Sequence, residues 1–204
     1  MAEAPVLEDT ERTTGRVALR KNIAAAMALS GAVRSTLGPK GLDKLLLDDE
    51  GRTLVTNDGV TVLETARVEH PVARMLIDAS SAQDRAARDG TTSAVVIAAE
   101  LLRNAWHLVL QGVHPSTIVR GYRMAEIEAM THLESIAFEG NEDNLVTAVR
   151  SSLAGKASRG VQTRLADLAM EAARCVERTV DGTHEVDPTR VSKVIAVGRP
   201  ATDS

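Results

Sequence analysis

Aromatic residues are almost absent from this chain of 204 residues, which contains one Trp, one Tyr and one Phe. Surfaces that bind single-stranded nucleic acid by base stacking need several aromatic side chains, so we expect no such function. The formal net charge of -4 also argues against a broad positive field that would attract nucleic acid. The core must instead be built from Ala, Val, Leu, Ile and Met, a composition typical of closely packed helices.

Cysteine is equally scarce, because Cys175 is the only one in the chain. A single cysteine forms neither an internal disulfide nor a zinc site made of several thiolates. This favours a reducing, cytoplasmic environment. The N-terminal residues are acidic and polar, unlike a signal peptide, and no apolar run approaches the ~20 residues of a membrane span, so we expect no association with membranes.

The spacing of apolar residues predicts a mainly α fold with one β-hairpin. Residues 1–15 are expected to form a flexible tail, and two short apolar runs around an acidic turn, 44–48 and 52–56, predict the hairpin. The segment that starts at Pro71 is apolar at helical spacing except for Gln83. The helix at 91–110 is apolar on nearly all sides, which predicts a central, buried helix. Helices are expected at 16–36, 60–66, 71–88, 91–110, 115–136, 145–153 and 160–179, and a strand at 191–197.

A first segment suited to anion binding follows the first predicted helix and reads Thr36-Leu37-Gly38-Pro39-Lys40-Gly41. Two glycines let backbone amides approach an anion closely, and Lys40 adds a positive charge. The alternative interpretation is a simple helix stop, because Gly and Pro commonly end helices.

A second such segment, Asp89-Gly90-Thr91-Thr92-Ser93, opens the most apolar helix. A helix N-terminus offers free N–H groups and the positive end of the helix dipole, and hydroxyl groups add further donors to a phosphate. Asp89 is placed to hold Mg²⁺ against phosphate oxygens. The alternative is that Asp89 or Thr91 only caps the helix.

Two further segments carry charged side chains. Asn57-Asp58-Gly59 places a carboxylate after the predicted hairpin, where it could orient water for phosphoryl transfer, although such a tripeptide is also an ordinary turn. Lys156 follows Gly155 but is not part of a P-loop, because the required earlier glycine and the following Ser or Thr are absent. Its alternative interpretation is a solvated lysine at a helix C-terminus.

Taken together and in this order, these segments resemble the chaperonins, either the group II type (archaeal thermosome and eukaryotic cytosolic) or the related bacterial group III. The resemblance runs from about Arg16 onward and covers residues 36–44, 55–59, 70–71, 89–92, 114–116 and 153–156 in particular. It implies an ATP-hydrolysing chaperone subunit that uses ATP and Mg²⁺. The implied partners are other chaperonin subunits in a double ring and unfolded client proteins.

The resemblance also implies a domain organisation. Residues 16–143 would form the N-terminal half of an equatorial ATP-binding domain, a helical bundle with a β-hairpin. Residues 144–204 would form the first segment of an intermediate domain, with the polar break at 140–144 as the border. The chain would then be truncated before the apical domain, which binds clients, and would lack the adenine pocket and a further catalytic aspartate. The strand at 191–197 would pair with the returning segment.

The same resemblance implies roles for individual residues. Asp58 would be the catalytic residue that positions the attacking water, Asp89 would ligate Mg²⁺, and Lys156 would sense the γ-phosphate. The contacts to ATP and its phosphates are implied for Leu37, Gly38, Pro39, Gly90, Thr91, Thr92 and Ser93.

Two positions depart from the family pattern. Arg88 stands where Gly is usual, and Ser93 stands where Thr is common, so the aspartate and the hydroxyl groups are kept while the position before Asp89 carries a side chain. A truncated, non-hydrolysing chaperonin-like fragment that acts only in assembly or is inactive is an alternative function. An unrelated helical phosphate-binding protein is a third hypothesis.

Overall fold

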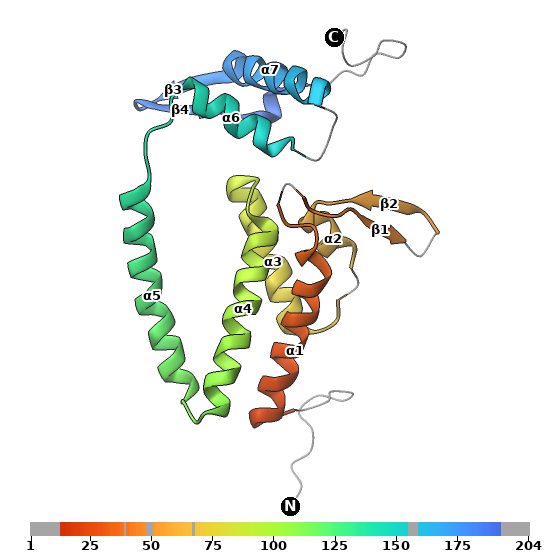
Figure 1. Ribbon diagram of the computed structural model, residues 1–204, viewed down its shortest axis with the longest axis vertical. Coiled ribbons are helices and arrows are strands. Elements are labelled where there is room, and N and C mark those ends of the chain that lie inside the picture. The colour runs from red at the N-terminus through yellow and green to blue at the C-terminus, as the bar shows by residue number, and fades with distance from the viewer. Residues whose placement is uncertain (1–12, 39, 48–50, 67, 155–158, 193–204) are drawn as a thin grey trace, which may run out of the picture. The chain divides into compact units, whose positions relative to one another are not determined.

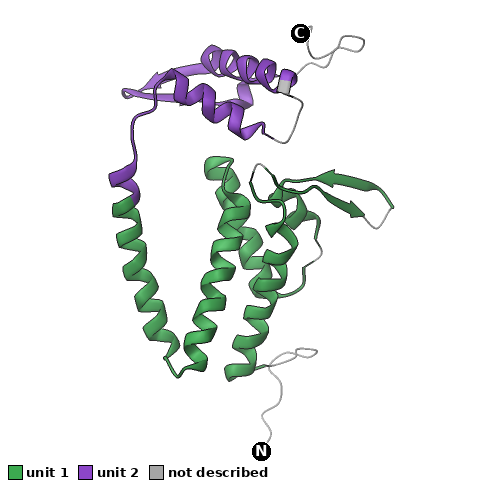
Figure 2. Cartoon of the chain, viewed as in Figure 1, with its two compact units in different colours: residues 1–132 green, residues 133–204 purple. Residues whose placement is uncertain are grey.

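The computed structural model describes residues 13–38, 40–47, 51–66, 68–154 and 159–192 (Figure 1). Within these residues the chain forms seven α-helices, two β-hairpins and a short 3-10 helix, which confirms the predicted mainly α fold. The chain divides into two compact units, residues 1–132 and 133–204 (Figure 2). The assignment of an equatorial segment to 16–143 and an intermediate segment to 144–204 stays a prediction.

The core of the first unit lies between three helices, α1 (Gly15–Arg34), α3 (Pro71–Ala87) and α4 (Thr91–Leu110), with the short α2 (Gly59–Thr65) packed against them. Helical spacing explains why the core-facing residues of α1 share one face. Small side chains such as Ala26, which is fully buried, let the helices approach closely. The buried cluster consists of Ala26, Leu29, Val33, Val62, Leu63, Ala73, Leu76 and Val95.

Local signals set the ends of α3 as predicted. Pro71 occupies the first helical position, where its missing N–H has no partner to lose, and the His70 ring accepts a hydrogen bond from the Val72 N–H at 3.3 Å. The helix ends at Ala87 because Arg88 adopts the left-handed conformation, with φ of 54°. This chain reversal brings α4 back alongside α3, and α4 has the bounds that the sequence predicts.

The predicted hairpin is confirmed. Strands β1 (Lys44–Leu47) and β2 (Thr53–Thr56) pair antiparallel, with Lys44 opposite Thr56 and Leu47 opposite Thr53. The hairpin leads directly into the Asn57-Asp58-Gly59 turn and α2, so it fixes where that turn begins.

The prediction that 91–110 is a central, buried helix is wrong for the described residues. Only Thr92, Val95 and Ala99 of α4 are buried, and Ile97 is 59% exposed, because α1 and α3 cover one face of the helix and leave the rest open. An 18-residue window of this helix has a mean hydropathy of 1.3, so by length and composition alone the helix could cross a membrane, contrary to the expectation from the sequence. The core helix of a soluble protein has the same composition, so this is weak evidence for a membrane.

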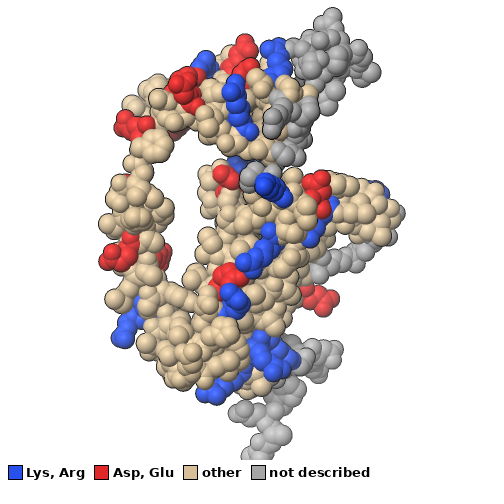
Figure 3. Space-filling model, in the orientation of Figure 1, with Lys and Arg blue, Asp and Glu red and all other residues tan. Residues whose placement is uncertain are grey.

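Helix α5 (Pro115–Ile136) follows α4 and spans the border between the two units. The Tyr122 hydroxyl donates a hydrogen bond to the Leu101 carbonyl at 2.7 Å, which ties the first part of α5 to α4. On the face seen in Figure 3, basic and acidic side chains are interspersed, and no area of one sign extends across it. This distribution agrees with the small net charge of the sequence.

The second unit contains α6 (Glu142–Ser152), α7 (Arg159–Val176), β3 (Glu177–Val180), β4 (Thr183–Val186) and the 3-10 helix η1 (Pro188–Arg190). Asn141 and Asn144 cap α6 through reciprocal side-chain bonds to each other's backbone N–H groups, at 3.0 and 2.9 Å. A capped start and an amphipathic sequence explain why α6 forms here.

The prediction of a helix up to residue 179 is wrong, because α7 ends at Val176 and residues 177–180 form β3. Strands β3 and β4 pair antiparallel around Asp181 and Gly182, which have φ of 51° and 80°. Two left-handed residues in sequence make the tight turn that suits the twist of a hairpin. Val191 and Ser192 are not in a strand, and the rest of the strand predicted at 191–197 lies outside the described residues.

An ion-pair group links α1 to α4. Glu100 accepts a hydrogen bond from Arg34 at 2.8 Å and pairs with Arg103 at 2.5 Å. Partial burial of Glu100 raises the pKa of its carboxyl, but the hydrogen bonds and charges of Arg103 and Arg34 outweigh this, so the pKa lies below its ordinary value of 4.5. The folded state therefore favours the ionised carboxylate.

This lowered pKa gives a prediction about acid stability. The stabilisation is present above pH 4.5 and is lost as the pH falls through the lower pKa of the folded state. Glu100→Gln should therefore make the unfolding midpoint in urea less sensitive to pH in this acidic range. Glu126→Gln, an exposed change on α5, serves as the control, and identical pH profiles for wild type and Glu100→Gln would contradict the assignment.

Candidate functional site

The start of α4 has no side-chain cap. Its N-cap is Gly90, which has φ of 78° and no side chain, so no side chain caps the helix. The alternative that Asp89 or Thr91 merely caps α4 is therefore wrong. The first N–H groups of a helix have no partner within the helix and, with the dipole, favour an anion. Thr91 and Ser93 are partly exposed in this first turn, whereas Thr92 is buried.

Asp89 lies between α3 and α4 and is exposed. Its Oδ1 accepts a hydrogen bond from the Gly90 N–H at 2.8 Å, and its backbone carbonyl accepts one from Nε2 of Gln83 at 2.9 Å. Its other carboxylate oxygen receives no hydrogen bond from any described residue, so that oxygen is available to a cation.

The residues present fit Mg²⁺ bound together with phosphate. Mg²⁺ is usually held by one or two carboxylates and by substrate phosphates rather than by an all-protein cage. Asp89 supplies one carboxylate beside a helix start that suits phosphate. Among the described residues, no cluster of three or more His, Cys, Asp or Glu could hold a metal alone.

Arg88 shows how the chain accommodates its departure from the family pattern. It adopts the left-handed conformation, which costs a residue with a side chain roughly 1–2 kcal/mol and explains why Gly is usual there. Its N–H donates to the Asp84 carbonyl at 2.9 Å, and its guanidinium pairs with the Asp84 carboxylate at 3.1 Å. Arg88 therefore adopts the backbone conformation that a glycine would adopt more easily at this position.

Asp58 is the N-cap of α2. Its Oδ2 accepts hydrogen bonds from the N–H of Thr61 at 3.0 Å and from the hydroxyl of Thr61 at 2.6 Å. Its Oδ1 has no hydrogen bond from a described residue. Asp58 is exposed, so capping occupies one oxygen and leaves the other accessible to solvent.

Gly59 and Thr92 bring two of the predicted segments together. A Cβ at Gly59 would lie 3.2 Å from Cβ of Thr92 and still closer to its hydroxyl oxygen, so the backbone of α2 contacts this side chain directly. Both residues are buried. The turn that carries Asp58 therefore packs against the first turn of α4, which follows Asp89.

The segment after α1 forms a tight turn. Gly38 has φ of 82°, and its carbonyl accepts a hydrogen bond from the Gly41 N–H at 2.9 Å. Leu37 is 44% exposed. Helices α1 and α4 run antiparallel, so this turn and the start of α4 lie at the same end of the unit (Figure 1). Pro39 and Lys156, the two remaining predicted residues, lie outside the described residues.

Sequence reasoning missed Gln83 as a site residue. The signal was its polarity at an otherwise apolar helical position, but its bond to Asp89 depends on the chain reversal at Arg88. No local pattern specifies this contact.

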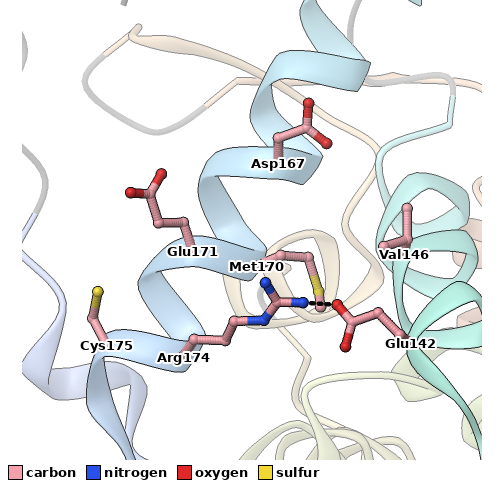
Figure 4. Close-up of a pocket in the computed structure, with 7 residues that line it drawn as sticks. All are labelled: Glu142, Val146, Asp167, Met170, Glu171, Arg174 and Cys175. Carbon is pink, nitrogen blue, oxygen red and sulfur yellow. Dashed lines mark ion pairs between the residues drawn. The ribbon is translucent and has the colours of Figure 1, made fainter.

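The second unit contains a pocket of about 510 Å³ between α6 and α7 (Figure 4). Arg174 and Glu142 form an ion pair across it, and Asp167 and Glu171 add negative charge from α7. The net negative charge of this lining disfavours phosphate.

Comparison with known proteins identifies the class of protein. Residues 29–204 match the TCP-1/cpn60 chaperonin family, and the chain belongs to this family. The family resemblance predicted from the ordered segments is thereby confirmed.

Thermosome subunits are among the similar relatives. Thermosome subunit alpha of Archaeoglobus fulgidus is 46% identical over 193 residues, which are 92% of this chain and 35% of the relative. The thermosome subunit of Methanocaldococcus jannaschii is 43% identical over 199 residues, or 95% and 37% of the two chains. Thermosome subunit beta of Thermoplasma acidophilum is 40% identical over 200 residues, or 97% and 37%. The chain spans little more than a third of the length of these curated relatives.

Proposed function

We propose that this chain carries the phosphate- and Mg²⁺-binding part of the ATP site of a chaperonin subunit. The observation that carries the proposal is the contact of Gly59 with Thr92, which brings the Asp58 turn against the helix start that follows Asp89. A water-orienting carboxylate and a phosphate-binding helix start must lie together for phosphoryl transfer. Membership of the chaperonin family supports the same assignment.

The residues have distinct roles in this proposal. Asp89 holds Mg²⁺, which neutralises charge on the phosphates when bound. The backbone at Gly90 and the hydroxyl groups of Thr91, Thr92 and Ser93 donate hydrogen bonds to phosphate oxygens. Asp58 accepts a hydrogen bond from the attacking water through the oxygen that Thr61 leaves unused.

The turn after α1 completes the phosphate contacts. Leu37, Gly38 and Pro39 pack against the nucleotide, and the left-handed φ of Gly38 allows the backbone to approach it closely. The roles of Pro39 and of Lys156 as a γ-phosphate sensor rest on the sequence resemblance alone.

At the level of the whole protein, we propose an ATPase whose turnover drives the folding of unfolded proteins. The similar relatives are named as thermosome subunits, which supports assembly with other subunits in a double ring. A cytoplasmic location is supported by the single cysteine, and we expect neither nucleic acid nor membrane as a partner.

The test is ATP turnover by the full-length protein. Asp89→Ala should lower Mg²⁺-dependent turnover by about tenfold or more, because losing a metal contact weakens metal affinity by at least that factor. Asp78→Ala, which removes an exposed carboxylate from α3, is the matched control and should have little effect. Full turnover in Asp89→Ala would overturn the site assignment, and absence of ATP turnover in the wild type would favour the non-hydrolysing alternative.

A further inference from the structure

The C-terminal part of α3 holds the segment that starts α4. The hydroxyl of Ser80, which is fully buried, donates to the Thr91 carbonyl at 3.3 Å. One turn later, the amide of Gln83 donates to the Asp89 carbonyl at 2.9 Å. Residues three apart on a helix lie on the same face, so these two side chains anchor the same segment at successive points.

Asp89 lies outside the hydrogen-bond ladders of both helices. The residues on either side of it, Arg88 and Gly90, have left-handed φ of 54° and 78°. Among the described residues, Gln83 is the only one whose side chain bonds to the backbone of Asp89. This bond therefore holds the Asp89 backbone directly, whereas Ser80 holds the segment two residues further on.

The peptide group between Asp89 and Gly90 links Gln83 to the carboxylate. This group is planar, so its carbonyl and its N–H keep fixed directions relative to each other. Gln83 holds the carbonyl at 2.9 Å, and Oδ1 of Asp89 accepts from the N–H at 2.8 Å. Fixing the plane therefore fixes the carboxylate, and with it the direction of the free oxygen.

Gln83 also lies close to Gly90, where an added side chain would meet it. A Cβ at Gly90 would lie 3.4 Å from Nε2 of Gln83 and 3.9 Å from its Cγ. The absence of a side chain at Gly90 thus leaves room for Gln83 beside the peptide, and a variant of Gln83 that keeps its length tests the hydrogen bond alone.

We propose that Gln83 is a positioning residue that orients the Asp89 carboxylate toward Mg²⁺ by holding the Asp89–Gly90 peptide. This inference rests on the proposed function, because it takes Asp89 as the Mg²⁺ ligand. Gln83 itself touches neither metal nor nucleotide in this scheme.

The experiment measures ADP binding to the full-length protein by calorimetry, once with excess Mg²⁺ and once with EDTA. The readout is the factor by which Mg²⁺ increases ADP affinity. Gln83→Met keeps the length of the side chain but removes the donor. It should reduce this factor by about tenfold, as loss of a group that orients a metal ligand typically does, with the affinity in EDTA unchanged.

Asn104 provides a matched control. Its amide also donates to a backbone carbonyl, that of Glu100, at the same distance of 2.9 Å but further along α4. Asn104→Leu removes an equivalent bond and should leave the Mg²⁺ factor unchanged. Where Gln83→Met does not fold, Gln83→Ala replaces it in the same measurement.

Asp89→Asn separates failure of this inference from failure of the proposed function. If Mg²⁺ no longer increases ADP affinity in Asp89→Asn but still does so normally in Gln83→Met, the role of Gln83 is overturned and the Mg²⁺ site stands. A normal factor in Asp89→Asn overturns the Mg²⁺ site and the inference together. If Gln83→Met lowers ADP affinity equally in Mg²⁺ and in EDTA, the role of Gln83 is also overturned, because the change would then act on nucleotide binding in general.

Discussion

Asp58→Asn should leave the protein folded but lower its ATP turnover by about 10²–10⁴-fold, the usual contribution of a group that accepts a proton during catalysis. Asn caps helices as well as Asp does, so the hydrogen bonds from Thr61 to this residue can persist. The change removes the negative charge of the oxygen proposed to orient water. Turnover of the full-length protein and its unfolding midpoint are measured on the same preparation.

Asp187 offers an internal control for this substitution. Its carboxylate accepts bonds from the N–H and hydroxyl of Thr189 at 3.0 and 2.6 Å, the same distances as at Asp58. Asp187→Asn therefore makes the same local change without touching the proposed site, and turnover should stay near wild type. If Asp58→Asn also retains turnover, Asp58 is only a cap. Asp58→Ala should cost about 1 kcal/mol of stability in addition, because alanine cannot cap α2.

The parts of the fold that follow from local sequence were predicted well. Pro71 starts α3 because its ring suits the first helical position, and α4 starts at Thr91 directly after its N-cap, Gly90. The hairpin of β1 and β2 follows from two apolar runs around a glycine-containing turn. In each case the determining residues lie within a few positions of the feature, so no distant contact is needed.

Two features of the fold were not predicted, one that depends on distant contacts and one that a local turn signal indicates. The burial of α4 was overestimated, because composition gives the apolarity of a helix but not how many neighbours cover it. The hairpin of β3 and β4 was missed because the helical pattern of α7 was extended through residues 177–179, although Asp181-Gly182 is a strong turn signal.

The candidate site shows the same division. The family resemblance identified Asp58 and the start of α4 as site residues, each from its own segment of the sequence. Their packing through Gly59 and Thr92, and the bond from Gln83 to Asp89, join residues that are not neighbours in the sequence. Such contacts depend on how the helices pack, which one sequence does not specify.

Gly59→Ala should damage the site through this packing. The φ of Gly59 is not in the left-handed region, so the α2 backbone accepts alanine, and the effect is steric alone. The added methyl would meet the Thr92 side chain, which is buried and β-branched and so has little freedom to move. We expect a loss of about 1–3 kcal/mol in the free energy of unfolding from overpacking.

Turnover should fall by about 10²-fold in the same variant, because separating α2 from α4 by even ~1 Å displaces Asp58 from the phosphates. Gly31→Ala is the control, since Gly31 lies within α1 with no atom within 4 Å of an added Cβ. It should stabilise the protein by about 0.5–1 kcal/mol, as alanine does in place of glycine in a helix.

Thr92→Ala, combined with Gly59→Ala, removes the clashing hydroxyl and should restore much of the lost stability. It should not restore turnover, because the Thr92 hydroxyl is itself a proposed phosphate donor. Equal stability and turnover in Gly59→Ala and wild type would show that the two segments do not pack in this way.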